Sequence, residues 1–283
     1  MLNVRKMAAA CNYDLRKMII NPKLYAILLL IVMFASDRLG NLSSFLTQFN
    51  VKISAFGLAG YLLSDVQMTL LMVVGGMILF SNAPFIDDGQ LLLVIRTRKK
   101  EWVAGQQMYI HLFSFLLVLT MSLAPLLLFA GQLDFTNTWD KAISTLTQTN
   151  MGSSYQVKIQ FLHALQLKFT PYNLYWIGLL FKWILIDILA QVMFSVNVIQ
   201  RKRYGIIVVL AYSLLDISIE QMLSTELYKY SLVSLSRLST LGTGYLYVLP
   251  TFEYRSFVFS VAVVLMSGLS YILAIRSDIL ESF

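Results

Sequence analysis

Residues 107–130 read QMYIHLFSFLLVLTMSLAPLLLFA, an apolar stretch without a single Asp, Glu, Lys or Arg. A helix rises about 1.5 Å per residue, so roughly 20 such residues cross the hydrocarbon layer of a bilayer. Residues 256–275, SFVFSVAVVLMSGLSYILAI, have the same character. These two stretches predict membrane-spanning helices, and the rest of the chain must be interpreted around them.

The overall composition supports a membrane protein. Of the 283 residues, 58% are hydrophobic and 13% charged, with a mean hydropathy of +0.69. Soluble domains have about 25% charged residues, so lipid must cover much of this surface. Cys11 is the only cysteine, which excludes an intramolecular disulfide framework and a multi-cysteine metal site. No uninterrupted apolar core occupies the first twenty residues, so we expect no cleavable signal peptide.

Six stretches have the length and composition of membrane-spanning helices. The first is short because Asp37 and Arg38 end it, and the fifth carries Asp216 and Glu220 at its far end. We therefore predict an all-α integral membrane protein with one domain over residues 1–283. The expected spans are 20–36, 62–83, 107–130, 174–196, 204–220 and 256–275.

Lys and Arg are distributed unevenly between the connecting segments. With the N-terminus inside, the inside segments hold thirteen basic residues in 61 positions, against eight in 103 outside. This bias predicts cytoplasmic N- and C-termini and argues against a nucleic-acid partner, because the basic excess follows the topology. The inside segments are 1–23, 84–106, 197–203 and 276–283, and the outside ones are 37–61, 131–173 and 221–255.

The first segment, 1–21, predicts an amphipathic helix that ends at Asn21-Pro22, where the chain turns into the first span. Basic residues flank its apolar arc, which is typical of a helix lying in the interface of an anionic membrane. An ordinary packing helix is the alternative. The apolar residues are Val4, Met7, Ala8, Cys11, Leu15, Met18 and Ile19, and the basic ones are Arg5, Lys6, Arg16 and Lys17.

A second amphipathic helix is expected in the inside segment 84–106. On a helical wheel its apolar residues share one side, and the charged Arg96, Lys100 and Glu101 lie off it. Asp87 and Asp88 stand at its N-terminus, where the helix dipole favours negative charge. A positively charged tether without further function is the alternative. The apolar side consists of Leu91, Leu92, Ile95, Trp102 and Val103.

Together these two helices resemble the permease subunits of type-2 ATP-binding-cassette (ABC) exporters. The resemblance covers the whole chain and includes an acid–x–Gly–x–x–Leu…Arg…Gly pattern. It implies a coupling helix at about 87–101 seated on a separate ATPase chain, and short re-entrant helices within 221–254. The matching residues are Asp87 or Asp88, Gly89, Leu92, Arg96 or Arg98, Glu101, Trp102 and Gly105.

Motifs for catalysis or nucleotide binding are missing from the sequence. It has no P-loop, H-E-x-x-H, C-x-x-C or G-x-S-x-G pattern. His111 lies on the third span beside Ser114, and we interpret it as a packing residue. We therefore predict no catalytic site, no metal site and no cofactor in this chain, with ATP and Mg²⁺ bound by the partner ATPase that the resemblance implies.

Polar residues inside the spans form the remaining candidate site, because unpaired charges there are costly. Trp183, Asp187 and Gln191 lie on one face of the fourth span, which also holds Lys182. Asp216 and Glu220 share a face of the fifth. These residues either line a transport path, form an interface between protomers, or make structural ion pairs between helices.

The sequence therefore favours the membrane subunit of an ABC exporter in a bacterial plasma membrane, paired with a second permease. Aromatic and Met-rich spans without a charged central cavity favour an amphipathic peptide, a lipid or a hydrophobic drug as substrate. A secondary transporter or an ATPase-independent receptor is the alternative, but we find no inverted repeat or broken helix. An intramembrane enzyme is disfavoured because no acid–base pair is evident.

Overall fold

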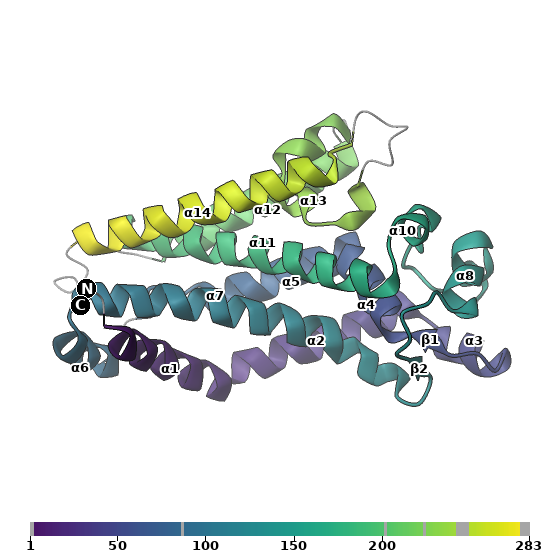
Figure 1. The fold of residues 1–283 in the computed structure, drawn as a ribbon, viewed down its shortest axis with the longest axis horizontal. Helices are drawn as coiled ribbons and strands as arrows, with labels where there is room; N and C mark the ends of the chain where they lie inside the picture. The colour runs from purple at the N-terminus through teal and green to yellow at the C-terminus, as the bar shows by residue number, and fades with distance from the viewer. Residues whose placement is uncertain (1–2, 86–87, 201–202, 223–224, 242–248, 278–283) are drawn as a thin grey trace.

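The computed structural model describes residues 3–85, 88–200, 203–222, 225–241 and 249–277. The chain is 80% helical, and its long helices run along one axis (Figure 1). The long elements are α1 (Val4–Ile20), α2 (Pro22–Leu39), α5 (Val66–Phe80), α7 (Lys99–Leu123), α11 (Pro171–Gln200), α12 (Gly205–Met222) and α14 (Phe252–Arg276). The shorter ones are α3 (Leu42–Gln48), β1 (Ile53–Ser54), α4 (Ala55–Ser64), α6 (Asp88–Thr97), η1 (Ala124–Phe129), β2 (Leu133–Asp134), α8 (Lys141–Gln148), α9 (Met151–Ser154), α10 (His163–Lys168), η2 (Thr225–Tyr230), α13 (Leu232–Leu235) and η3 (Leu238–Thr240).

Three segments of the described chain are long and apolar enough to cross a membrane by themselves: Lys99–Phe129, Pro171–Gln200 and Phe252–Arg276. Two bent helix pairs, α1 with α2 and α4 with α5, raise the number to five if each pair counts as one span. The shorter α12 is also apolar over Gly205–Ile219. The fold is thus that of an all-α membrane protein, as the composition predicts.

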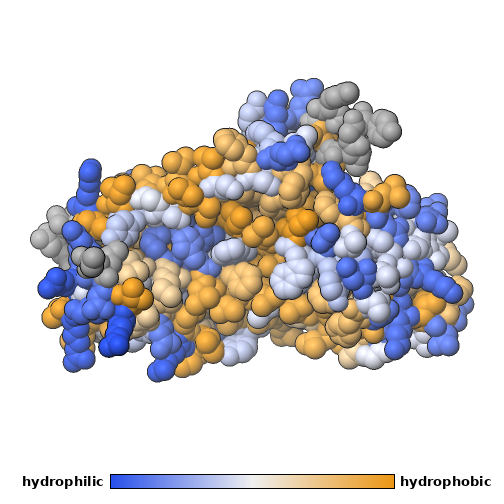
Figure 2. Space-filling model, in the orientation of Figure 1, coloured by the Kyte–Doolittle hydropathy of each residue, from blue (hydrophilic) through white to orange (hydrophobic). Residues whose placement is uncertain are grey.

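Helix α11 is the centre of the bundle. In the most apolar 18 residues of α11, 72% of the residues are buried, compared with 50% in the corresponding part of Lys99–Phe129 and only 17% in α14. Helix α14 packs on α11 and exposes a row of large apolar side chains to the outside. Figure 2 shows that apolar side chains cover most of the face turned to the viewer, with a hydrophilic hollow between α14 and α7. A surface of this kind suits contact with lipid or with another apolar protein.

The bend between α1 and α2 lies where the sequence predicts it. Proline cannot continue the preceding helix, because its ring clashes with the last turn and it lacks an N–H donor. The side chain of Asn21 caps α2 by accepting a hydrogen bond from the Lys23 N–H at 3.0 Å, and Pro22 takes the first helical position. The two helix axes meet at 59°.

A second bend, of 77°, separates α4 from α5 and corrects the sequence prediction. Residues 62–83 were expected to form one span and 37–61 a loop, but the helix begins at Ala55 and breaks at Asp65. Asp65 caps α5 by accepting from the Met68 N–H at 2.9 Å, and its other oxygen binds Arg38 at 2.8 Å. Burial of a paired carboxylate at the break thus fixes the bend.

The segments expected to be long outside loops form a folded cap at one end of the bundle (Figure 1). Strands β1 and β2 pair in parallel, with Ile53 opposite Leu133, and so join residues from both segments. Leu42, Phe45, Ile143 and Leu165 are buried among them. These two segments therefore bury their apolar residues against each other, whereas the sequence analysis could treat them only as separate loops.

At the other end of the bundle, the expected single helix over 87–101 is divided into two. Helix α6 ends at Thr97, and Arg98 has a φ of +75°, which breaks the helix before α7 starts at Lys99. The third span therefore begins eight residues earlier than 107, the position predicted from hydropathy. We call this region, which holds α1, α6, the start of α7 and the end of α14, the α6 end.

Candidate functional site

Asp14 connects three helices at the α6 end. Its carboxylate is almost fully buried and accepts hydrogen bonds from the side-chain amides of Gln90 on α6 and Gln106 on α7, the latter at 2.7 Å. Trp102 on α7 donates from Nε1 to Oε1 of Gln90 at 2.5 Å. Buried charge-assisted bonds of this kind hold their partners in one geometry. We call Asp14, Gln90, Trp102 and Gln106 the α1–α6–α7 junction.

Gly105 permits the close approach of α1 and α7 at this junction. A Cβ atom at position 105 would lie 2.7 Å from the Cβ of Ala10 and 2.8 Å from the backbone oxygen of Met7. The second contact is with backbone and cannot move away cheaply. The glycine that contributes to the resemblance to exporter permeases thus has a direct packing role in this chain.

The buried face of α1 differs from the predicted apolar arc. Ala10, Cys11, Asp14 and Met18 are buried, whereas the predicted members Val4 and Ile19 are exposed, at 71% and 53%. The helix therefore packs through one part of its apolar arc together with Asp14, and the remaining apolar residues face outward. Of the four basic residues, Lys6 is half-buried and three are exposed: Arg5, Arg16 and Lys17.

The residues proposed for ATPase coupling are divided between an exposed and a buried set. Leu92 is 62% exposed and Ile95 79%, and Arg96 and Arg98 are also exposed. Trp102 is fully buried in the junction and Val103 is buried as well, so the predicted apolar side does not form one exposed surface.

The other coupling candidates have varied positions. Glu101 is buried and Gly89 is half-buried. Asp87 and the side chain of Asp88 lie outside the described residues. The predicted helix dipole interaction of these two acids is therefore not tested by the structure.

A second polar site lies on one side of a groove between α7, α11 and α14. Nδ1 of His111 on α7 lies 2.9 Å from Oδ1 of Asp187 on α11, and Nε2 of the same ring lies 3.4 Å from Oγ of Ser267 on α14. Trp183 donates to Ser114 Oγ at 3.1 Å and so packs beside the pair. His111 thus joins an acid and a hydroxyl from two other helices.

Three buried polar atoms near this pair lack a hydrogen-bond partner: Nε2 of Gln107, Oδ2 of Asp187 and Nε2 of Gln191. The amide oxygens of Gln107 and Gln191 lie 3.2 Å and 2.7 Å from Ser270 Oγ, whose single proton is closer to Gln191. Buried polar groups are usually paired, so unpaired ones next to a groove are places where a ligand or water can bind. The groove occupies about 850 Å³, within the range of small-molecule sites.

The walls of the groove are mainly apolar and aromatic, and its polar groups gather near His111. Met7 of α1 also contributes to the wall, so the groove reaches the α6 end. The lining residues are Met7, Ala104, Gln107, Met108, His111, Leu112, Phe115, Trp183, Ser267, Gly268 and Tyr271.

The polar face of α11 is directed into the bundle, and its predicted role in a transport path or a protomer interface stays a prediction. Trp183, Asp187 and Gln191 do point to one region, where Asp187 and Gln191 are buried. Lys182 points elsewhere, so it is not the partner of Asp187. Its ammonium donates to Thr69 Oγ1 at 2.6 Å and to Ser236 Oγ at 2.8 Å.

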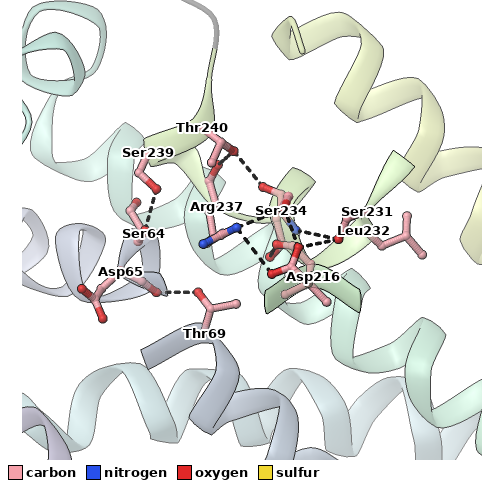
Figure 3. A network of polar contacts seen from close by, with 12 residues as sticks. Ser64, Asp65, Thr69, Asp216, Ser231, Leu232, Ser234, Arg237, Ser239 and Thr240 are labelled. Atoms are coloured by element: carbon pink, nitrogen blue, oxygen red, sulfur yellow. Dashed lines mark hydrogen bonds and ion pairs between the residues drawn. The ribbon is translucent and has the colours of Figure 1, made fainter. Parts of the chain in front are cut away.

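Asp216 organises a third polar cluster, shown in Figure 3. One of its oxygens accepts hydrogen bonds from the hydroxyls of Ser231, at 2.5 Å, and Ser234, and the other lies 3.4 Å from Arg237. All these side chains are buried. The cluster fixes the turns of η2, α13 and η3 to α12, which makes a structural ion pair the best interpretation of Asp216. The side chain of Glu220 lies outside the described residues.

Arg255 at the start of α14 stabilises the same turns. Its fully buried guanidinium donates to the backbone oxygens of Leu235, at 2.9 Å, Arg237, at 2.5 Å, and Thr240. Leu235 ends α13 and Thr240 ends η3, so their oxygens lie at helix ends, where carbonyl groups lack partners within the helix. The Arg237 oxygen also accepts from the Thr240 N–H at 3.3 Å. Short helices are present in the described part of 221–254, and a buried arginine holds them. That they are re-entrant stays a prediction.

No protein-family model, curated protein or solved structure matches the chain. Among the described residues, no group of three or more His, Cys, Asp or Glu could hold a metal ion. The fold and the sites define the class as an all-α protein with three to five candidate membrane-spanning helices.

Proposed function

We propose that this chain is the membrane subunit of an ABC exporter and receives work from a separate ATPase through α6. The main support is the combination of two properties in α6. Its outer side exposes Leu92 and Ile95, and its inner side is tied to α1 and α7 through Gln90. A short helix that is exposed to a partner and firmly joined to two long helices can pass a displacement into the bundle.

The proposed topology has six spans with both termini in the cytoplasm. Each bent pair then counts as one span and α12 as the sixth. In support, the α6 end collects basic residues from four separate segments: Arg16 on α1, Arg96 on α6, Lys99 on α7 and Arg276 on α14. Lys99 donates to the backbone oxygen of Ser277, which joins two of these segments. Positive charge favours the cytoplasmic side of a membrane.

The proposed complex contains a second permease, identical or homologous, and two ATPase chains that bind ATP and Mg²⁺. The exposed apolar face of α14 provides a surface for the second permease, in a bacterial plasma membrane. For the substrate we propose an amphipathic peptide, lipid or hydrophobic drug, because the groove combines apolar walls with polar groups near His111.

The test is a double substitution on the exposed side of α6. Leu92→Asp with Ile95→Asp should release the ATPase during purification in mild detergent, or uncouple ATP hydrolysis from export. Burial of each side chain in a partner contributes about 1.5–3 kcal/mol, so the double variant should weaken binding by at least about 100-fold.

The matched control is Phe135→Asp, which changes an exposed apolar residue at the opposite end of the bundle. This control should bind and couple normally. Wild-type ATPase binding and export in the double variant would contradict the role of α6.

A secondary transporter is the second candidate, because the structure contains the broken helix that the sequence did not reveal. Broken helices form midplane substrate sites in such proteins. The α4–α5 break is, however, closed by the Arg38–Asp65 pair at the end of α2. Transport that persists without any ATPase and depends on an ion gradient would favour this candidate.

A further inference from the structure

Ser267, His111 and Asp187 are connected in the order of a hydroxyl, a base and an acid. Ser267 Oγ lies 3.4 Å from His111 Nε2, and His111 Nδ1 lies 2.9 Å from Asp187 Oδ1. A nucleophile, a base within hydrogen-bond reach and a third group that orients the base are the signature of nucleophilic catalysis, and the first distance is often loose without substrate. The arrangement is defined by geometry, since the three residues come from different helices.

Both reacting side chains are accessible from the groove. Ser267 and His111 line it, and the His111 side chain is 37% exposed, whereas Asp187 behind it is 1% exposed. Gly268 follows the serine, and a Cβ at this position would meet no atom within 4 Å. A substrate can therefore approach the hydroxyl from the groove, while the carboxylate is shielded and can only orient the imidazole.

We propose that this site hydrolyses carboxylic esters of amphiphiles that enter the groove from the surrounding lipid. The walls beside the site, which include Met108, Leu112 and Phe115, suit an acyl chain, and the polar groups near His111 suit the ester. The groove also extends to Met7 of α1 at the α6 end. This activity uses the groove proposed for the export substrate, but it is a different reaction and needs no ATPase.

The reaction divides into two balanced steps. First, Ser267 Oγ bonds to the ester carbonyl carbon, His111 Nε2 takes the hydroxyl proton, and the alcohol leaves with that proton. Water then attacks the acyl-serine, His111 takes one proton from the water and returns it to Ser267, and a carboxylic acid is released. Asp187 acts as a positioning residue that holds His111 with Nδ1 protonated.

Gln107 supplies the donor that the oxyanion requires. Gln107 lines the groove one helical turn from His111, its Nε2 has no hydrogen-bond partner, and its Oε1 lies 3.2 Å from Ser270 Oγ, one turn from Ser267. Side-chain amides serve as oxyanion donors in other sites, and loss of one such donor typically lowers the rate by about 100- to 1,000-fold. The backbone N–H groups of α14 are engaged within the helix, so this role must be filled by a side chain.

The test is labelling of the purified full chain in nanodiscs by a long-chain alkyl fluorophosphonate, which reacts covalently with activated serines. We expect one labelled site, at Ser267, and faster hydrolysis of a long-chain than of a short-chain p-nitrophenyl ester. Ser267→Ala and Ser267→Cys should both abolish labelling. His111→Gln should lower the labelling rate by about 100-fold or more. Asp187→Asn should lower it too, and Asp187→Glu should restore part of the loss.

The control is Ser256→Ala, since Ser256 lies on the same helix and bonds only to its own turn at Phe252. It should be labelled like wild type. Melting temperatures of all variants identify any that fail to fold, and the two Ser267 variants provide independent chances of a folded chain. An unlabelled, folded wild type, or undiminished labelling of a folded Ser267 variant, overturns the proposal. Neither result affects the export function, which these assays do not involve.

Discussion

Replacement of Asp14 by alanine tests the α1–α6–α7 junction directly. The substitution removes the acceptor of two buried amide donors, Gln90 Nε2 and Gln106 Nε2. A buried donor left without an acceptor costs about 1–3 kcal/mol, so the two together should lower the free energy of unfolding by about 2–6 kcal/mol. One of these bonds connects α1 to α6, and its loss should make local opening of α6 easier by about 1–3 kcal/mol.

The assay is amide hydrogen exchange of the purified protein, followed by mass spectrometry over residues 88–97. A change of about 1–3 kcal/mol corresponds to roughly 5- to 150-fold faster exchange of α6. Exchange of α11, which has no contact with Asp14 through this network, should stay near its wild-type rate. The selective effect distinguishes local release of α6 from a general loss of stability.

Asp37→Ala is the matched control. Asp37 is 58% exposed and pairs with Lys158 at 2.6 Å, and exposed pairs contribute about 0–1 kcal/mol. It should leave exchange of α6 unchanged. Wild-type protection of α6 in Asp14→Ala, or equal loss of protection in both variants, would refute the idea that the junction holds α6.

Three further substitutions test other parts of the fold by thermal unfolding. Arg255→Met leaves buried backbone oxygens unpaired and should lower the free energy of unfolding by about 3 kcal/mol or more. Arg276→Met, at an exposed site on the same helix, should leave the free energy of unfolding nearly unchanged. Equal effects of the two substitutions would contradict the anchoring role of Arg255. Gly105→Val should force α1 away from α7 and lower the melting temperature, while Gly268→Val should be tolerated. A Gly105→Val variant as stable as wild type would contradict the packing role of Gly105. Burial raises the pKa of Asp140 above 3.8, although hydrogen bonds from backbone N–H groups oppose the shift. The stability that Asp140 contributes is therefore present below its unfolded pKa and lost as pH rises through its folded pKa. Asp140→Asn should gain stability relative to wild type from acid to neutral pH, and parallel pH profiles of the two proteins would disprove this.

Hydropathy predicted the helices because apolar runs of sufficient length have few alternatives in lipid. The bend at Asn21-Pro22 was predicted from the proline itself, because its cause is local. The bend at Asp65 escaped prediction because its partner, Arg38, lies 27 positions earlier. The residues on both sides of Asp65 are apolar, so the sequence reads as one span, and only the tertiary pairing shows where the helix breaks.

The candidate sites show the same difference between features with a local cause, which the sequence predicts, and features that depend on residues far apart in the chain. The spacing of Trp183, Asp187 and Gln191 was sufficient to place them on one face. The junction was missed because Asp14 is 76 positions from Gln90 and 92 from Gln106. One local signal was available, since Asp14 stands four residues from Ala10 and from Met18, which are both buried.

Helix α1 contacts both sites and thus connects them physically. Asp14 holds it to α6, its backbone crosses Gly105 on α7, and Met7 forms part of the groove wall. Met7 and Asp14 are seven residues apart, so about 10 Å of helix separates them. Because a helix is stiff over this length, a displacement of α6 that moves Asp14 must also move Met7. Any force applied to the exposed side of α6 would therefore change the shape of the groove before it reached the folded cap at the opposite end.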